Sequence, residues 1–348
     1  AVSRHLGLTQ RMLATQETGT GAMGQISTLL KAVIATSLTM QALLAVMFLP
    51  RFLTMGIDPA HAVWDAVFMA ISVFNNAGFV ILPGGLEPHV TDWWMLVPII
   101  LGTTVGAIGF PVIMDVAKNL RAPRRWRLHT KLTLSTYLIL AFIGALALAL
   151  TEWHNPATLG SVDTPSKILN AMLAGVNSRS SGLSALNVGA MHSQTHFVQD
   201  ILMMIGGGSA STAGGVKVTT FAVLVLAVIA EARGDRDIET FGRRIPTSTV
   251  RLAVAVSLLG LAMVAISVVL LLTMTDHSLD IILFETVSAF ATVGLSTGVT
   301  PNLPVAAKYV LIALMFAGRT GSMTVAAALA LRERSRVIRM PEEQPIIG

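Results

Sequence analysis

The sequence has no cysteine among its 348 residues, and it has few charged and few aromatic side chains. The absence of cysteine excludes a disulfide framework, a thiolate metal site and a cysteine nucleophile. Only 12% of the residues are charged, about half the share found in soluble domains. With 53% hydrophobic residues and a mean hydropathy of +0.70, the composition indicates a polytopic membrane protein rather than a soluble enzyme.

Two further absences bear on function. The sequence has no HExxH metalloprotease motif and no pair of aspartates within one apolar segment. The net charge is +5, but the basic residues cluster in short connections, which membrane topology explains better than nucleic-acid binding does. We therefore expect neither an enzyme nor a nucleic-acid-binding protein.

Long apolar segments dominate the rest of the chain, and most have about the 20 residues that a membrane span requires. Between some of them lie shorter apolar segments, which fit re-entrant half-helices better than spans. Asp58 and Thr164 each precede a proline at the start of such a segment, as N-capping residues do. The long segments are 26–49, 94–117, 132–150, 197–230 (interrupted), 250–273 and 305–331, and the short ones are 60–74, 165–177 and 279–291.

Basic residues are concentrated at 118–131, at 231–251 and at 332–339, and Arg4 and Arg11 precede the first apolar segment. If each apolar pair crosses, re-enters and returns, all these places fall on one side of the membrane. The positive-inside rule makes that side cytoplasmic, although basic side chains that snorkel at helix ends are an alternative explanation. The other side carries mainly acids, namely Asp58, Glu87, Asp92, Glu152, Asp163 and Asp276.

A single glycine follows the apolar part of each short segment, and in two of the three segments phenylalanine and serine also recur at matching positions. These glycines are Gly78, Gly182 and Gly294. The two closest copies are "FMAISVFNNAGF" (68–79) and "FETVSAFATVGL" (284–295), and the weaker middle copy is "MLAGVNSRSSGL" (172–183).

Non-helical backbone at membrane depth persists only where it lines a cavity or is buried in protein. Glycine lets carbonyl oxygens turn inward, and a ring of carbonyls can replace the hydration shell of a cation. The C-terminal ends of the half-helices add partial negative charge at the same place. The repeats therefore predict a cation filter, while a glycine that only packs at a helix crossing is the alternative at any single position.

Several motifs resemble the Trk/Ktr/HKT superfamily of potassium transporters, and most closely the Ktr-type membrane subunit. The resemblance extends over nearly the whole chain. It rests on "FNNAGF" (74–79), "NSRSSGL" (177–183), "ATVGLS" (291–296), "GGGSASTAGGVKVTT" (206–220) and "GRTGSMT" (318–324).

The resemblance implies an all-α polytopic membrane protein with four helix–pore-loop–helix repeats around a pseudo-fourfold cation pore. Three repeats are visible, so we expect the first to precede residue 1. The implied division is a cytoplasmic N-terminal segment (1–25), repeat two (26–120), repeat three with the gate loop 206–215 (121–240), repeat four (241–334) and a cytoplasmic tail (335–348).

The resemblance also assigns a selectivity filter, with potassium at Gly78, Gly182 and Gly294. The third family repeat usually reads Thr-Ala-Gly-Phe, whereas this chain has Ser-Ser-Gly-Leu at 180–183. The backbone geometry can survive this change, but the preference among ions is less secure. The implied filter residues are Asn76, Ala77, Gly78, Ser180, Ser181, Gly182, Thr292, Val293 and Gly294.

The glycine-rich stretch interrupts the segment 197–230, and in the family it forms an intramembrane gate below the filter. Its glycines predict hinges, and its hydroxyls can satisfy freed backbone groups. A Walker-type phosphate loop is not indicated, because Val216 separates the last glycine from Lys217. Arg319 is placed against this loop by the resemblance. The implied gate residues are Gly206, Gly207, Gly208, Ser209, Ser211, Thr212, Gly214, Gly215, Lys217 and Arg319.

The predicted function is potassium uptake across the bacterial plasma membrane as a pore-forming subunit. The resemblance implies a homodimer, regulated by a cytosolic ring of nucleotide-binding subunits and surrounded by membrane lipid. It implies no covalent cofactor, potassium as substrate, sodium as a candidate activator and nucleotide only through the partner. The alternatives are a sodium- or proton-coupled symporter and a non-conducting truncated fragment.

Three smaller expectations concern single side chains. Five histidines lie near connections without metal-ligand spacing, and we expect them to be exposed. Glu285 either orders its half-helix by hydrogen bonds, which we favour, or lies near the outer ion path. Arg179 either fixes its loop or tunes the outer field. The histidines are His61, His89, His154, His192 and His196.

Overall fold

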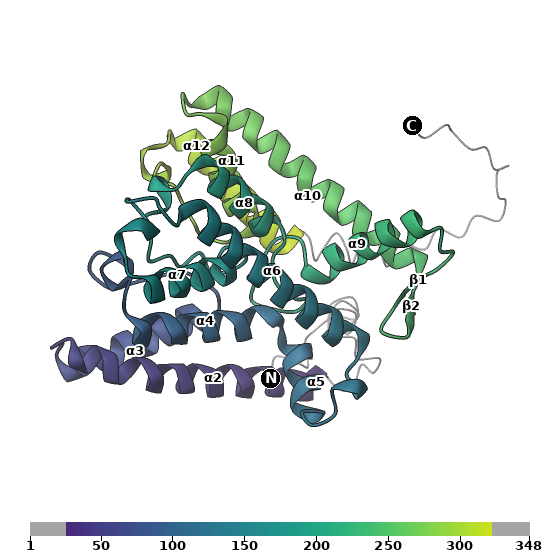
Figure 1. The fold of residues 1–348 in the computed structure, drawn as a ribbon, viewed down its shortest axis with the longest axis horizontal. Coiled ribbons are helices and arrows are strands. Elements are labelled where there is room, and N and C mark those ends of the chain that lie inside the picture. The colour runs from purple at the N-terminus through teal and green to yellow at the C-terminus, as the bar shows by residue number, and fades with distance from the viewer. Residues whose placement is uncertain (1–25, 322–348) are drawn as a thin grey trace.

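The computed structural model describes residues 26–321, which are mostly helical (Figure 1). The helices are α2 (Ile26–Thr54), α3 (Pro59–Phe74), α4 (Trp93–Ile108), α5 (Phe110–Lys118), α6 (Leu128–Glu152), α7 (Thr164–Asn177), α8 (Ser193–Met204), α9 (Val218–Arg233), α10 (Thr247–Met274), α11 (Leu279–Ala291) and α12 (Val305–Phe316), which continues in a π-helical turn (Ala317–Gly321).

The sequence did not predict a small antiparallel hairpin between α9 and α10. Its strands are β1 (Ile238–Thr240) and β2 (Arg243–Ile245), with Glu239 opposite Arg244. The turn between them has positive φ at Phe241 (49°) and Gly242 (71°), the geometry that joins two strands through two residues. Apart from these two strands, the regular elements in the described residues are helices, as expected.

The helices fall into three successive groups, each with a long helix, a short helix and a returning helix (Figure 1). In each group the short helix packs along its long neighbour, α3 on α2, α7 on α6 and α11 on α10. Contacts of α4 with α7 and of α8 with α11 join consecutive groups. The short helices lie within a residue of the three short apolar segments in the sequence.

Three helices within residues 26–321 are long and apolar enough to cross a membrane, and a bent pair makes up to four. They lie within α2, α6 and α10. Their outer faces are apolar and exposed, as with Leu38 (61%) and Phe142 (68%). A face of this kind suits lipid rather than water, so the described part is a membrane protein. The segment 305–331 is described only to residue 321.

The segment 94–117 is not one continuous span, contrary to the prediction. The chain bends by 95° between α4 and α5 at Gly109, whose φ is 93°. A side chain there would collide with the carbonyl of Ser209, so Gly109 permits both the bend and the close approach of another backbone segment. Pro111, in the first turn of α5, suits a helix start and not a helix interior.

The two predicted helix caps have different outcomes. Asp58 caps α3, because its Oδ2 accepts a hydrogen bond from the backbone N–H of Ala60 at 3.1 Å. The prediction for Thr164 was wrong. That residue is the first residue of α7, and Asp163 occupies the cap position without a side-chain bond.

The sequence placed Glu152 among the acids of one side of the membrane and did not predict its burial. Glu152, at the end of α6, is 0% exposed and accepts hydrogen bonds from the Thr158 hydroxyl (2.7 Å), the Asn155 amide (2.6 Å), the backbone of His192 (2.9 Å) and the Thr195 hydroxyl. It therefore ties the end of α6 to the connections on both sides of α7.

The expected exposure was wrong for two of the five histidines. The His89 side chain is only 19% exposed, and His196 is 5% exposed. Its Nε2 lies 2.8 Å from the Val188 carbonyl, and its ring lies 4.9 Å from that of Phe284. It packs inside the structure between α8 and α11.

We expect Glu152→Gln to lower the apparent unfolding temperature in detergent by roughly 5 °C, since an amide in place of the carboxylate leaves buried donors unpaired. The matched control is Glu87→Gln, because Glu87 is an exposed carboxylate. Equal shifts for the two variants, measured by thermal unfolding, would contradict the structural role of Glu152.

Candidate functional site

Three glycine loops follow the short helices at one place in the fold. We name them the first (75–79), second (178–183) and third (292–296) glycine loops. Each turns on a glycine with positive φ, which is 76° at Gly78, 63° at Gly182 and 98° at Gly294. Side chains rarely adopt this conformation, so all three turns require glycine.

The three loops contact one another directly through their backbones. A side chain at Gly78 would collide with the carbonyl oxygen of Ser181, and one at Gly182 would collide with that of Val293. Gly294 has more room, because a Cβ there would lie 4.0 Å from the Ser181 carbonyl oxygen and would not collide with it. The structure thus brings together the glycines that the sequence predicted as a set, and several carbonyls lie beside them.

Polar side chains of the short helices hold the loops in place. The Ser72 hydroxyl donates to the Phe79 carbonyl (2.7 Å), and the Asn177 amide donates to the Leu183 carbonyl (2.8 Å). In the third loop, the Ser288 hydroxyl accepts a hydrogen bond from the Gly294 N–H at 3.1 Å. Each short helix therefore fixes the orientation of the loop that follows it.

The first and third loops also share a strained residue. Asn76 and Thr292 precede their glycines by two positions, and they have φ of 52° and 51°. Left-handed backbone at a non-glycine residue costs free energy and is kept where the surroundings impose it. Ser180, the equivalent residue of the second loop, is not in this conformation, so the second loop differs from the other two.

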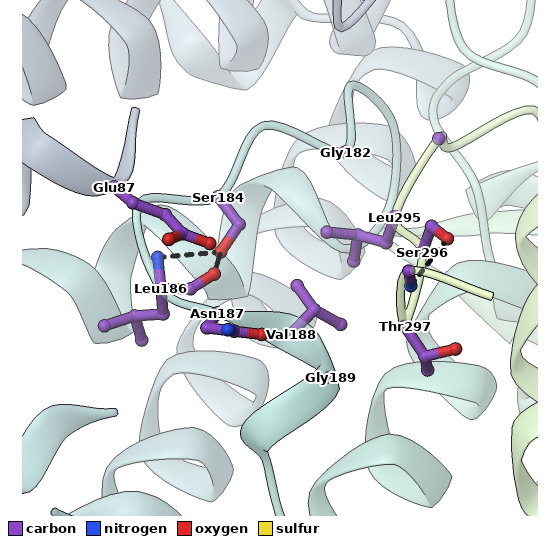
Figure 2. A pocket seen from close by; sticks show the side chains of 12 residues that line it. Glu87, Gly182, Ser184, Leu186, Asn187, Val188, Gly189, Leu295, Ser296 and Thr297 are labelled. Carbon is purple, nitrogen blue, oxygen red and sulfur yellow. Dashed lines mark hydrogen bonds between the residues drawn. The ribbon is translucent and has the colours of Figure 1, made fainter. Parts of the chain in front are cut away.

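A hollow of about 320 Å³ opens beside the second and third loops (Figure 2). Its walls combine backbone with polar side chains, including the exposed carboxylate of Glu87 near Ser184. It offers oxygen ligands and one negative charge, which favours a hydrated cation. Its lining residues are Glu87, Gly182, Ser184, Leu186, Asn187, Val188, Gly189, Gly294, Leu295, Ser296, Thr297 and Gly298.

Glu285 holds the third loop and the residues after it, whereas the sequence favoured a role in ordering its own half-helix. Its Oε1 accepts hydrogen bonds from Ser296 (2.9 Å) and from the N–H of Thr297 (2.7 Å), and its Oε2 accepts one from Thr300 (2.6 Å). The sequence at 294–298 (GLSTG) has the Gly-x-Ser-x-Gly spacing that hydrolases use for a nucleophilic serine. This stretch follows a helix rather than a strand, and its serine donates a hydrogen bond to Glu285, so the structure does not support a nucleophile elbow.

The glycine-rich segment (residues 206–215) separates α8 from α9 and forms a closed loop. A parallel bridge joins Ile205 to Val216 at its base. The N–H of Gly206 donates to the Val216 carbonyl (2.8 Å), and the N–H of Val216 donates to the Met204 carbonyl (3.2 Å). The interruption predicted within 197–230 is present, and both of its ends are held.

This segment packs on the end of α4. The N–H of Gly208 donates to the Ala107 carbonyl at 2.8 Å, and the N–H of Phe110 donates to the Ala210 carbonyl at 3.4 Å. Helix ends leave carbonyl groups without partners inside the helix. The break at Gly109 therefore exposes backbone groups that the glycine-rich segment satisfies.

Most glycines of this segment are needed because another backbone segment lies against them, and not because they add flexibility. A side chain at Gly207 or Gly208 would collide with the carbonyl of Ala107 or Ile108, and one at Gly214 with Ala291 and Thr292. Of the five predicted hinge glycines, only Gly215 has a positive φ (68°). Their small size lets the segment lie directly against the third glycine loop.

Thr212 connects this segment to the first glycine loop. Its hydroxyl oxygen accepts a hydrogen bond from the Asn76 amide at 2.5 Å and lies 3.0 Å from the Gly106 carbonyl, to which it donates. Its own carbonyl accepts a hydrogen bond from Nη1 of Arg319, as the resemblance led us to expect. Arg319 itself is exposed.

The remaining polar residues of the predicted gate bond locally. The Ser209 hydroxyl lies 3.2 Å from that of Thr219, and the Ser211 hydroxyl accepts from the N–H of Ala213 at 3.2 Å. Lys217 donates to the Ala213 carbonyl at 2.8 Å. All the predicted gate residues thus lie in or beside one loop.

Sequence reasoning missed two contributors from α4. Gly106 lies against the Phe74 carbonyl, where a side chain would collide. The Thr103 hydroxyl lies 3.5 Å from that of Ser181. Glycines and threonines at 102–109 were the available signal, but the apolar residues around them masked it.

Known cation transport proteins are similar to this chain. The sequence profile of the TrkH family, described as "Cation transport protein", matches residues 4–338. Ktr system potassium uptake protein B of Bacillus subtilis (strain 168) is 36% identical over 348 residues, which is 100% of this chain and 77% of that protein. The Vibrio alginolyticus protein of the same name is 32% identical over 99% of this chain and 75% of its own length.

A third relative and a solved structure are also similar to this chain. The potassium/sodium uptake protein NtpJ of Enterococcus hirae is 31% identical over 88% of this chain and 67% of that protein. The crystal structure of the potassium transporter TrkH from Vibrio parahaemolyticus matches with a TM-score of 0.70 and 18% identity, covering 93% of this chain and 68% of that one. At that identity the structural match shows a shared fold. The named relatives are transporters, not enzymes.

We expect Gly208→Ala to displace the glycine-rich segment from α4, because the added Cβ would collide with the Ile108 carbonyl. The chain has no cysteine, so Ser209→Cys gives a single reporter. In the Gly208→Ala background, the rate of maleimide labelling should rise by about tenfold or more.

Ala210→Gly is the matched control for that substitution. Ala210 has a φ of 52°, which glycine adopts without strain, so labelling should stay at the rate of the parent protein. Unchanged labelling in Gly208→Ala would contradict the steric account of the segment.

Proposed function

This chain belongs to the TrkH family of cation transport proteins, and on that premise we propose that it forms a pore for potassium uptake across the bacterial plasma membrane. The observation that carries the proposal is the meeting of three positive-φ glycine turns, at Gly78, Gly182 and Gly294, where the first two leave no room for a side chain. Its named relatives are potassium uptake proteins.

In this proposal the carbonyls of the three glycine loops form the selectivity filter. Carbonyl oxygens replace the water around potassium, and the C-terminal ends of α3, α7 and α11 add partial negative charge. The membrane potential drives entry with about 2.3 kcal/mol per charge at 100 mV. The filter comprises residues 76–78, 180–182 and 292–294.

We further propose that 26–120, 121–240 and 241–334 act as three pore repeats, with basic connections on the cytoplasmic side. The arrangement of the helix groups supports this division. The connection 118–131 and the hairpin between α9 and α10 lie at the same end of the molecule (Figure 1). Both carry arginines, and arginine-rich loops favour the cytoplasmic side.

The glycine-rich segment, with Lys217 and Arg319, is the proposed gate. It lies against the first and third glycine loops, and the contact of Arg319 with the Thr212 carbonyl supports the closed arrangement. A cation placed below a filter also opposes the passage of other cations. Opening then requires this contact to break.

We propose a homodimer in lipid, regulated by a cytosolic ring of nucleotide-binding subunits. The support is the name of two relatives, each called a protein of a Ktr system. Nucleotide would act only through that partner, and no covalent cofactor is needed for conduction. A pull-down of the ring with the membrane subunit tests the association.

Sodium is the second candidate ion, because one relative is a potassium/sodium uptake protein. The altered residues at 180–183 lie in the loop that differs from the other two. A sodium- or proton-coupled symporter would need the coupling ion for every transport cycle. A pore would conduct potassium without it.

Uptake of rubidium into proteoliposomes by the complete protein tests the proposal. We expect saturable uptake driven by an inside-negative potential, which potassium inhibits more strongly than sodium does. Absence of uptake would refute the pore. Strict dependence on sodium or on a proton gradient would instead support the symporter.

Arg319→Ala should raise rubidium flux by roughly threefold or more, because it removes the contact to Thr212 and a charge from the ion path. The matched control is Lys308→Ala, a half-buried lysine on α12 that donates to the Pro301 carbonyl (2.7 Å). Flux that is equal in the two variants would refute the gate role.

A further inference from the structure

A positive charge is buried at the base of the second glycine loop. Arg179 lies three residues before Gly182, at the position that Asn75 and Ala291 occupy in the other two loops. Its side chain is 0% exposed, and it is the largest of the fully buried side chains described. One loop of the three therefore carries a fixed cation where its counterparts are neutral.

The contacts of Arg179 place it behind the loop rather than in the outer hollow. Its Cζ lies 3.6 Å from the centre of the Tyr137 ring on α6, and its Nε donates to the Gly175 carbonyl at 3.4 Å. Arg179 does not line the hollow of Figure 2. Of the two roles that the sequence left open, an outer-field role is therefore not supported.

The charge of Arg179 has no carboxylate partner among residues 26–321. None of the ion pairs there includes it, and its Nη1 and Nη2 hydrogen-bond to no described residue. The aromatic face of Tyr137 and the C-terminal carbonyls of α7 offset the cost of burial only in part. An arginine stays protonated under such conditions, so the positive charge remains.

The groups around Arg179 are polar but uncharged. The Tyr137 ring covers the guanidinium, and the hydroxyl of the adjacent Ser180 is buried without a hydrogen-bond partner in the described chain. A charge in low-dielectric surroundings acts over longer distances than one in water. The second loop also contacts both of the others, through Ser181 and Gly182, so the field of Arg179 acts on all three.

The sign of this effect opposes cation binding. The C-terminal ends of α3 and α11 direct partial negative charge toward the loops, and neither helix has a basic residue in its last turn. At α7, Arg179 offsets that contribution. A pore must bind its ion strongly enough to admit it and weakly enough to release it.

Resting on the function proposed above, we propose that Arg179 sets the affinity of the filter for potassium. Its buried charge weakens cation binding at the second glycine loop and so speeds release. Arg179 acts through the field of its charge and not by contact with the ion, so it is not a ligand of the filter.

The experiment measures rubidium binding by calorimetry in detergent and uptake in proteoliposomes, both with the complete protein. Arg179→Gln should lower the Kd and the half-saturating concentration by about fivefold or more, with a lower maximal rate. Arg179→Lys keeps the charge, and its Kd should stay within about twofold. Lys167→Gln removes a charge from the other end of α7, where it bonds to the Trp153 carbonyl, and should change neither value.

The outcomes separate the two proposals. If the unmodified protein takes up no rubidium, the proposed function fails. If it transports and folded Arg179→Gln keeps the Kd of the unmodified protein, Arg179 only supports the fold, and the inference is overturned. The same follows if Arg179→Lys is folded but changes the Kd as much as Arg179→Gln does.

A converse variant keeps the test decisive if neither Arg179 variant is recovered folded. Asn75→Lys places a second cation at the equivalent position of the first loop, where the side chain is half-buried. It should raise the Kd for rubidium by about fivefold or more. An unchanged Kd overturns the inference.

Discussion

Backbone that is not helical needs hydrogen-bond partners wherever it lies between membrane-spanning helices, because lipid supplies none. The three glycine loops and the glycine-rich segment find their hydrogen-bond partners in one another and in the end of α4. The Gly208 N–H uses a carbonyl that α4 leaves free, and Thr212 bonds to Asn76 in the first loop. Such contacts require the backbones to come closer than any Cβ would allow. The glycines, the break at Gly109 and the polar caps of the short helices all follow from that closeness.

The described elements could largely be predicted from the sequence. Apolar length placed the three short helices within a residue, and the repeated glycine pattern identified the three loops that contact one another. Periodicity could not reveal the bend at Gly109, because the residues on both sides remain apolar and the cause is a distant segment. The hairpin was missed for a similar reason, since its turn depends on two φ angles and not on hydrophobic pattern.

The candidate site was predicted as a list of residues but not as a set of contacts. The sequence suggested that the glycine-rich segment is flexible, whereas most of its glycines are needed where another backbone touches them. The same limit applies to Glu152 and His196, whose burial depends on α8 folding back over the end of α6 and onto α11. Composition identifies which residues are unusual, but only the packing says what makes each of them necessary.

The bridge between Ile205 and Val216 has a mechanical consequence. It clamps the two ends of the glycine-rich segment together, so the segment is a flap on a fixed base and not a stretch of unwound helix. A flap of this kind can swing without lengthening or rotating α8 and α9. Displacement then stays local, and the dimensions of the surrounding bundle need not change when the flap moves.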